Sequence, residues 1–322
     1  MEIKIYIKER IEQAIQKIGF ADKKAVSVEL MFGKQKGHGD ITTNVAFNLA
    51  SKVKKNPREI AQLLVDTMEL DKEWIQKVEV GGAGFINFTL SFNYLYKTLQ
   101  KILEQDKHYG FSNWGDGKKT QVEFVSANPT GPMNVVSARA AAVGSTLANA
   151  LRAVGHDVHT EFYVNDAGNQ IRLLGESCSA RIAQIKGKKA TIPEEGYHGE
   201  YLIEYAQEYI DTNPKQSVEE WIADRILSEQ KEVLQKFNVH FDVWFSEKKF
   251  RESGKVQEVL ERLENGNFTY KKDDALWFAA SRLNDDVRDF VLVKSDGQWA
   301  YGLVDVAYHV NKFEERGFQR VY

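Results

Sequence analysis

The chain has 322 residues, 43% of them hydrophobic and 28% charged, a composition typical of globular proteins with a substantial core and room for two domains. Its net charge of −3 argues against a strongly basic nucleic-acid binder, although a local basic patch would still allow such binding. A single cysteine (Cys178), a charged N-terminus and no long apolar run exclude an intrachain disulfide, a signal peptide and a membrane span, so we expect a cytoplasmic protein.

Residues 1–90 are expected to form a small α+β domain. Apolar residues recur at helical spacing from Ile7 to Ile18, and Val26 to Phe32 alternates like a strand. Pro57 suits the first turn of a later helix, where its missing N–H costs nothing. The run 78–90 predicts a strand, a glycine turn and a second strand.

Four basic residues lie just before Pro57 or directly after it, and we call them the basic cluster: Lys52, Lys54, Lys55 and Arg58. Such a cluster can contact nucleic-acid phosphates, and it can equally be the solvated end of a helix. The charges of residues 1–90 nearly balance, so charge alone leaves both interpretations open.

Residues 91–118 are expected to be a linker containing a helix from Tyr94 to Glu104. The segment 119–175 then has the pattern of a parallel βαβ unit: a strand at 121–125, a helix that ends at Gly155, and a strand at 158–164. Small residues mark the buried face of the helix: Ala138, Ala141, Ala142, Ser145 and Ala148.

The turn between the first strand and this helix is the candidate ligand site. Ligands of open α/β sheets bind beyond the carboxyl ends of the strands, and helix N-termini favour phosphate. The turn has neither the P-loop spacing nor the GxGxxG spacing. Glu123 lies inside the first strand, where burial of a charged carboxylate costs free energy unless a partner compensates the charge. It either forms an internal ion pair, with Arg139 as a possible partner, or contacts a ligand.

The segment VEFVSANPTGPMNVVSARAAAVG resembles the active-site entry of class I arginyl-tRNA synthetases. In that family the turn usually ends in a His-Ile-Gly-His-like sequence, whereas this chain has Asn134-Val135-Val136-Ser137. Degenerate versions occur in some bacterial branches, so the departure does not by itself indicate an inactive protein. GHGDITTNVAF and GGAGFINF resemble the additional N-terminal domain of the same family, which contacts the outer corner of tRNA.

From 176 to 273 the sequence predicts a mainly helical insertion, with helices near 200–210, 217–237 and 254–263 and a short strand at 242–247. Ser217 and Glu220 have the spacing of a capping box. Asn165-Asp166 is expected to cap a helix beginning near Gly168, with contact to a substrate as the alternative. Strand patterns return at 275–280 and 288–294. A helix is predicted over 303–315, followed by a strand at 319–322. Tyr301 and Asp305, four residues apart, can face one pocket.

The resemblance implies an incomplete Rossmann-like parallel sheet with a helical insertion, preceded by a small α+β domain. The implied domains are an N-terminal tRNA-contacting domain at 1–90, the linker, the first half of the catalytic domain at 119–175, the insertion at 176–273, and the start of the second catalytic half at 274–322. Family members continue with a Lys-Met-Ser-Lys-Ser loop and an anticodon-binding domain, so we expect a fragment that is inactive alone.

The function implied is ligation of L-arginine to tRNA through an arginyl-adenylate made from ATP, with Mg²⁺ accompanying the ATP, no protein metal site, and a monomer. Asn134 and Ser137 are the candidate catalytic residues. The implied ATP-binding residues are Ala127, Asn128, Pro129, Thr130, Gly131, Pro132, Met133, Asn134, Val135, Val136 and Ser137. The implied arginine-binding residues are Glu123, Ser126, Asn128, Tyr301 and Asp305, and the tRNA-binding residues are the basic cluster. The alternative is a non-catalytic synthetase paralogue that binds tRNA or arginine.

Overall fold

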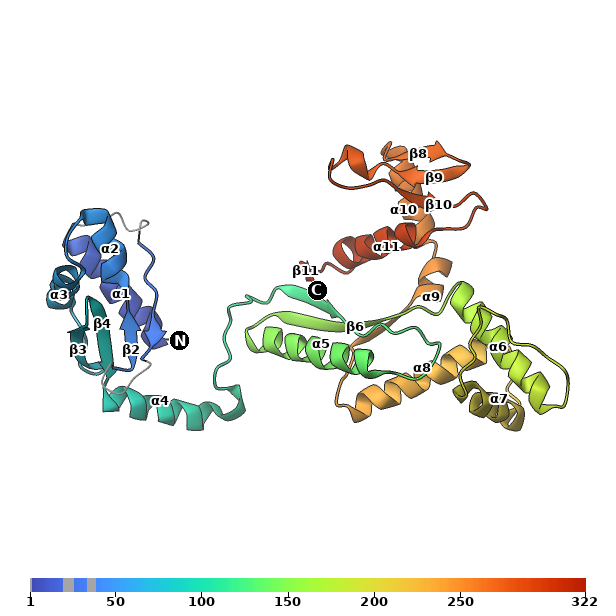
Figure 1. The fold of residues 1–322 in the computed structure, drawn as a ribbon, viewed down its shortest axis with the longest axis horizontal. Helices are drawn as coiled ribbons and strands as arrows, with labels where there is room; N and C mark the ends of the chain where they lie inside the picture. Colours follow the sequence, from blue (N-terminus) through green and yellow to red (C-terminus); the bar gives the residue numbers. More distant parts are fainter. Residues whose placement is uncertain (1, 20–25, 34–38) are drawn as a thin grey trace. The chain divides into compact units, whose positions relative to one another are not determined.

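The computed structural model describes residues 2–19, 26–33 and 39–322. The chain divides into two compact units, Met1–Tyr109 and Gly110–Tyr322 (Figure 1). The division lies inside the segment 91–118 that we expected to be a linker, because helix α4 (Phe92–Gln105) and the 3₁₀ turn η1 (Asp106–His108) belong to the first unit.

The first unit packs helices against a small antiparallel sheet. Its remaining elements are α1 (Glu2–Lys17), β1 (Met31–Phe32), β2 (Ile41–Thr43), α2 (Val45–Val53), α3 (Pro57–Thr67), β3 (Ile75–Gly81) and β4 (Phe85–Leu90). Among the described residues the strand order is β1-β2-β4-β3. The strand expected over 26–32 is shorter: only Met31 and Phe32 pair with β2, while Val28 packs into the core without a ladder partner among the described residues. Gly37 and His38 of the GHGDITTNVAF segment lie outside the described residues.

The second unit, which the structure describes completely, contains a parallel sheet. Its strands are β5 (Lys119–Glu123), β6 (Asp157–Val164), β7 (Val243–Ser246) and β11 (Arg320–Val321), in the order β11-β5-β6-β7. Each neighbouring pair is parallel. Helix α5 (Val135–Ala153) connects β5 to β6, which confirms the predicted βαβ unit and the α/β fold class.

Helix α5 lies very close to the sheet because its inner face is made of small residues. Ala141, Gly144 and Ala148 are the buried residues of this helix, whereas Ala138 and Ala142, which we expected on the same face, are exposed. A Cβ placed on Gly144 would lie 2.1 Å from the Phe124 ring. The close approach brings the N-terminus of α5 to the edge where β5 ends.

A helical segment follows β6 and returns the chain to the sheet. It comprises α6 (Asn169–Ile185), α7 (Tyr201–Thr212) and α8 (Val218–Lys236), with Ser217 capping α8 as expected. Strand β7 lies within the range 176–273 expected to be an insertion, yet it pairs with β6 in the central sheet. The short helix α9 (Glu247–Glu252) follows β7.

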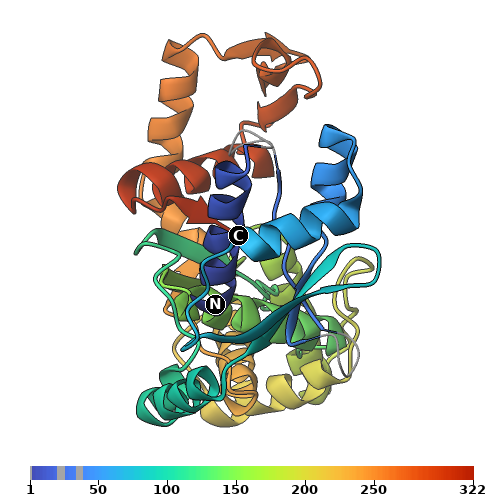
Figure 2. The same ribbon diagram turned by 90° about the vertical axis from the view of Figure 1, so that its left-hand side faces the viewer.

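The last part of the unit is a small antiparallel sheet between two helices. It comprises α10 (Lys255–Asn265), β8 (Thr269–Lys272), β9 (Ala275–Phe278), the 3₁₀ turn η2 (Ala280–Arg282), β10 (Phe290–Val293) and α11 (Tyr301–Val310). In both views α10 and this small sheet lie on one side of the parallel sheet, and α6 and α7 lie on the other (Figures 1 and 2). Helix α11 continues as a π-helical turn, η3 (Asn311–Glu315), which leads directly into β11 beside β5.

Candidate active site

Strand β5 ends in a strained turn at the carboxyl edge of the parallel sheet. Val125 and Ser126 have φ angles of +67° and +44°. A β-branched residue rarely adopts this region, and such strain costs on the order of 1–3 kcal/mol. The turn is held by Ser126, whose Oγ accepts a hydrogen bond of 3.0 Å from the backbone N–H of Tyr163 at the end of β6. Strain of this kind is concentrated at ligand sites.

The loop after this turn is held in place by side chains from α7 and α8. Gln230 is buried, and its Nε2 donates to the carbonyl oxygens of Asn128 (3.1 Å) and Gly131 (3.2 Å). The hydroxyl of Tyr201 donates to the carbonyl of Thr130 at 2.6 Å. Burial raises the pKa of Tyr201 to about 12, so its hydroxyl remains a donor at neutral pH. The helical segment therefore sets the shape of the loop.

Asn134 caps helix α5. Its Oδ1 accepts hydrogen bonds from the backbone N–H groups of Val136 (3.0 Å) and Ser137 (3.1 Å). These are two of the donors that a helix N-terminus would otherwise offer to a phosphate. Val135 and Val136, in the first turn of the same helix, are 82% and 69% exposed. Asn134 therefore occupies part of this helix N-terminus with its own side chain.

Glu123 forms an internal ion pair, but its partner is Lys312 and not Arg139. The Lys312 ammonium lies 2.6 Å from Oε2 of Glu123. Arg139, which we considered as the partner, is exposed on α5. Lys312 reaches Glu123 because α11 and its π-turn cover the face of β5 from which Glu123 projects.

A second glutamate lies directly beside Glu123 on the next strand. Glu161 is the register partner of Glu123 between β5 and β6, and it is fully buried. Arg316 forms a forked ion pair with Glu161, with Nη1 donating to Oε1 at 3.0 Å and Nη2 donating to Oε2. The cation offsets the repulsion expected between neighbouring carboxylates.

The Tyr308 hydroxyl bridges these two carboxylates. It lies 2.9 Å from Oε2 of Glu123 and also within hydrogen-bonding distance of Oε1 of Glu161. A phenol has one proton, so it donates to one carboxylate at a time. Burial, with the two negative charges, raises the pKa of Tyr308 far above its usual range, which keeps the hydroxyl protonated.

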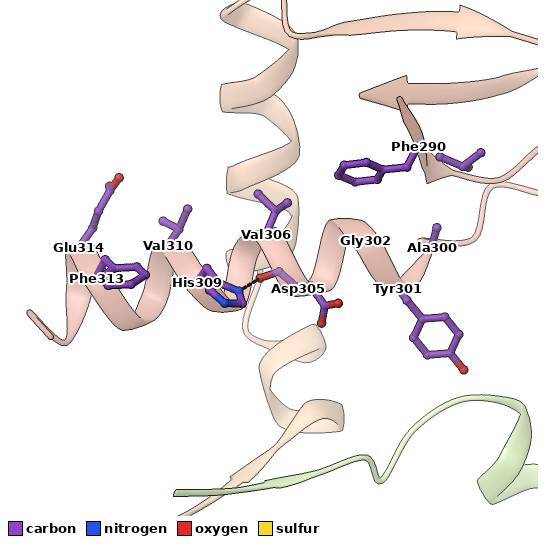
Figure 3. A pocket seen from close by; sticks show the side chains of 11 residues that line it. Phe290, Ala300, Tyr301, Gly302, Asp305, Val306, His309, Val310, Phe313 and Glu314 are labelled. Atoms are coloured by element: carbon purple, nitrogen blue, oxygen red, sulfur yellow. Dashed lines mark hydrogen bonds between the residues drawn. The ribbon is translucent and has the colours of Figure 1, made fainter. Parts of the chain in front are cut away.

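Tyr301 and Asp305 point to the same side of α11, as their spacing predicts, and away from Phe290 and Val306 (Figure 3). Both line a cavity of about 790 Å³. Within the second unit, which is described in full, Asp305 forms no ion pair, in contrast to Glu123 and Glu161. Nδ1 of His309 donates to the backbone carbonyl of Asp305 at 2.8 Å.

The surroundings of Asp305 disfavour its charge. Although the side chain keeps access to solvent, partial burial is the main cause that raises the pKa of its carboxyl, and the charge of Glu123 adds to the effect. His309, Lys312 and Arg251 act in the opposite direction. The balance leaves a carboxylate that gains from a bound cation.

Two other predicted residues bind neighbouring elements. Asn128 donates from Nδ2 to Oε1 of Gln170 on α6. Asp166 does not cap α6, which begins after Gly168 without a side-chain cap. Instead its carboxylate accepts hydrogen bonds from the Ser246 hydroxyl (2.6 Å) and the Lys248 backbone N–H (2.8 Å), at the start of α9.

The basic cluster lies on the first unit, at the turn between α2 and α3. Lys52, Lys54, Lys55 and Arg58 are all exposed there. Lys54 adopts the left-handed conformation that ends α2, and Asn56 caps α3 by accepting from the backbone N–H of Arg58. Exposure fits both phosphate binding and a solvated helix end.

Neither a metal-binding cluster nor a membrane-spanning helix is present within the described ranges 2–19, 26–33 and 39–322. No three acidic, histidine or cysteine side chains converge in the way that a protein-held metal ion requires. No helix within those ranges combines the length and apolar character needed to cross a bilayer.

Several residues around the site were not predicted from the sequence. Glu161 carried a usable signal, since it is a carboxylate inside a buried strand, as Glu123 is. Lys312 and Arg316 follow Tyr308 at steps of four residues on one helical stretch, a spacing that indicates one face. Gln230 and Tyr201 had no local signal, because their role is a contact with a loop about 70 to 100 residues away.

Comparisons with known proteins cover nearly the whole chain. Residues 6–90 match the family model described as "Arginyl tRNA synthetase N terminal domain", and residues 98–322 match "tRNA synthetases class I (R), catalytic domain". An arginine–tRNA ligase of Moorella thermoacetica is 45% identical over 299 residues, which cover 89% of this chain and 53% of that protein. An arginine–tRNA ligase of Caldanaerobacter subterraneus is 42% identical over 332 residues, which cover 99% of this chain and 59% of that protein.

Solved structures give the same result for the fold. A putative arginyl-tRNA synthetase of Campylobacter jejuni is 30% identical with a TM-score of 0.65, over 72% of this chain and 53% of that one. The arginyl-tRNA synthetase of Thermus thermophilus is 22% identical with a TM-score of 0.62, and the match covers 96% of this chain and 53% of that one. The chain therefore spans 53–59% of the length of these relatives.

Proposed function

The chain belongs to the class I arginyl-tRNA synthetase family, and we propose that its full-length protein activates arginine with ATP and transfers it to tRNA. In this reaction the arginine carboxylate attacks the α-phosphate of ATP, which yields arginyl-adenylate and releases pyrophosphate. The terminal adenosine of tRNA then takes the arginyl group and AMP leaves. The observation that carries the proposal is the meeting of α11 with the ends of β5 and β6, where Asp305 lies within electrostatic reach of Glu123.

Arginine recognition follows from the charges at this meeting point. A guanidinium is planar, permanently charged and rich in donors, so it requires a carboxylate acceptor. Asp305 supplies a carboxylate without an ion-pair partner in residues 110–322, and Tyr301 projects from the same side of α11 (Figure 3). Glu123 supplies a further acceptor, while Ser126 and Asn128 at the end of β5 hold the amino and carboxylate end of the substrate.

ATP is proposed to bind along the loop from Ala127 to Ser137. The chemistry is positioning and charge stabilisation at the phosphates. Asn134 contributes through its Nδ2 donors and Ser137 through its hydroxyl, while Oδ1 of Asn134 caps the helix. Mg²⁺ would accompany the nucleotide and be held mainly by its phosphates. We assign no step to a protein-held metal.

A second function has one specific observation in its favour. The N–H groups of Val136 and Ser137 are already occupied by Asn134, and Val136 places an exposed side chain where the family has glycine. Both features weaken a nucleotide site at this helix end. They favour a paralogue that binds arginine or tRNA without activating the amino acid.

Arginine-dependent ATP–pyrophosphate exchange by the full-length protein, with and without tRNA, separates the two functions. Exchange that requires arginine supports the ligase. Arginine binding measured by calorimetry, together with no exchange in either condition, supports the paralogue. If the full-length protein neither binds arginine nor catalyses exchange, both the ligase and an arginine-binding paralogue are refuted.

The role of Asn134 can be separated from its capping role. Asn134→Ser retains a side-chain oxygen able to cap α5 but removes the amide donors. We expect the thermal stability to be unchanged. ATP affinity should fall by roughly tenfold, which corresponds to a loss of about 1.4 kcal/mol from hydrogen bonds to a charged ligand. Titration of ATP measures this, with Ser217→Asn at the N-cap of α8 as the control. Equal ATP affinity in Asn134→Ser and the parent would leave Asn134 as a cap alone.

We further propose that the basic cluster contacts tRNA phosphates. The logarithm of tRNA affinity should then fall linearly with the logarithm of salt concentration. Replacing Lys54 by alanine should flatten that slope by about 0.9 if one phosphate contact is lost. Lys8→Ala, on α1 and paired with Glu12, is the control expected to leave the slope unchanged. Equal slopes for the two variants would favour a solvated helix end.

A further inference from the structure

Lys312 is a lysine in an unusual place, since it is 2% exposed within the π-helical turn after α11. Its ammonium lies 2.6 Å from Oε2 of Glu123 and 4.0 Å from the centroid of the Tyr308 ring. Lysine is almost never fully buried unless it is paired, so the ion pair with Glu123 accounts for a buried lysine at this position.

The π-turn explains how Lys312 and Arg316 both reach the sheet. On a regular α-helix each step of four residues drifts about 40° around the axis, so two steps from Tyr308 would carry Arg316 well off the inner face. The wider turn over Asn311–Glu315, closed by a hydrogen bond from the N–H of Arg316 to the carbonyl of Asn311, offsets that drift. Tyr308, Lys312 and Arg316 consequently all reach the glutamates on β5 and β6.

The charges on this face cancel in pairs. Lys312 compensates Glu123, and Arg316 compensates Glu161. Asp305 is the neighbouring carboxylate that has no ion-pair partner in the fully described second unit. A site with one uncompensated negative charge matches a ligand side chain with one positive charge.

The ion pair also fixes which oxygen of Glu123 is available. Oε2 receives both the Lys312 ammonium and the Tyr308 hydroxyl. Oε1 has no hydrogen-bond partner within residues 110–322, and the Glu123 side chain is 25% exposed. Stability does not require this arrangement, because a buried ion pair is often replaced by apolar groups without loss.

We propose that Lys312 is a positioning residue of the arginine site. It holds Oε2 of Glu123 and cancels its charge, so that Oε1 is presented to the substrate as a fixed acceptor and Asp305 alone provides the counter-charge for the guanidinium. This inference rests on the proposed function, since it names how the same site selects a singly charged side chain.

The test is a double-mutant cycle on arginine binding in the full-length protein. Lys312→Met is expected to weaken arginine binding at least tenfold, because Glu123 loses its fixed orientation. The KM for arginine should rise in parallel, whereas the KM for ATP should stay within twofold. In the Glu123→Gln background, the same lysine change should alter arginine affinity by less than twofold, since Lys312 acts only through Glu123.

Two further variants serve as a control for the cycle and as a substitute for Lys312→Met. Lys255→Met removes an exposed lysine whose partner, Glu315, lies on the same π-turn, and it should leave arginine binding unchanged. If Lys312→Met fails to fold, Lys312→Arg takes its place, because it keeps the cation and changes its geometry. The same loss of affinity, again absent in the Glu123→Gln background, is expected.

The outcomes distinguish this inference from the proposed function. A parent protein that neither binds arginine nor catalyses exchange overturns both. A parent that binds arginine, with a lysine variant that binds it equally well or more tightly, overturns only the role of Lys312. An equal loss in the Glu123→Gln background also overturns it, because Lys312 would then act independently of Glu123.

Discussion

Replacing Asp305 by asparagine is expected to weaken arginine binding by about 2–5 kcal/mol, the loss typical of a desolvated charge pair. This corresponds to roughly 30-fold to 5,000-fold in the dissociation constant. The change keeps the size of the side chain and removes its charge. The effect is large because Asp305, unlike Glu123 and Glu161, has no cation paired with it in the second unit and is therefore available to a guanidinium.

Calorimetric titration of L-arginine into the full-length variant measures this loss. Asp296→Asn is a suitable control, since Asp296 lies in an exposed turn of the same region and accepts from the backbone N–H of Gln298, which asparagine can also do. A dissociation constant for Asp305→Asn within twofold of the parent would show that the guanidinium is bound elsewhere.

The pH dependence of arginine binding gives an independent measure of the same residue. Burial raises the pKa of Asp305, so its carboxyl takes up a proton at a higher pH than the ordinary aspartate value of about 3.9. Only the ionised form attracts a guanidinium, so affinity should fall on acidification, beginning above that ordinary range. In Asp305→Asn this part of the pH dependence should be absent. A parent profile that remains flat down to the unfolding pH would contradict the assignment.

Features with local signals could be predicted from the sequence. The βαβ unit was predictable because strand and helix periodicities and the stop at Gly155 are all local. The spacing of Tyr301 and Asp305 also sufficed to place them on one side of α11 (Figure 3). Asp166 shows the limit of local reasoning: an aspartate shortly before a helix indicates a cap, but here the start of α9 competes for its oxygens and α6 begins uncapped.

The electrostatic part of the site could not be predicted in the same way. The contact between Lys312 and Glu123 joins residues 189 positions apart, and no local pattern specifies which cation meets a strand carboxylate. Arg139 was a reasonable partner on the nearest helix, but that side chain is exposed. The structure decides the pairing because η3 passes directly into β11, which lies beside β5.

The largest effect on stability is expected from Arg316→Met. The forked ion pair between Arg316 and Glu161 joins the segment after α11 to the centre of the sheet, and Glu161 is 0% exposed. Removing one partner leaves a buried carboxylate without compensation, which typically costs about 3–5 kcal/mol. We expect the free energy of unfolding of the second unit to fall by that amount, as measured by urea denaturation.

Two comparisons make the cause specific. Arg262 forms an equally forked pair with Glu314, but that pair is exposed, so Arg262→Met should leave the unfolding midpoint unchanged. The double variant Glu161→Gln/Arg316→Met removes the uncompensated charge and should recover most of the lost stability, since an apolar side chain beside a neutral amide no longer requires a cation. If Arg316→Met were as stable as Arg262→Met, the ion pair between Arg316 and Glu161 would not contribute to the stability of the second unit.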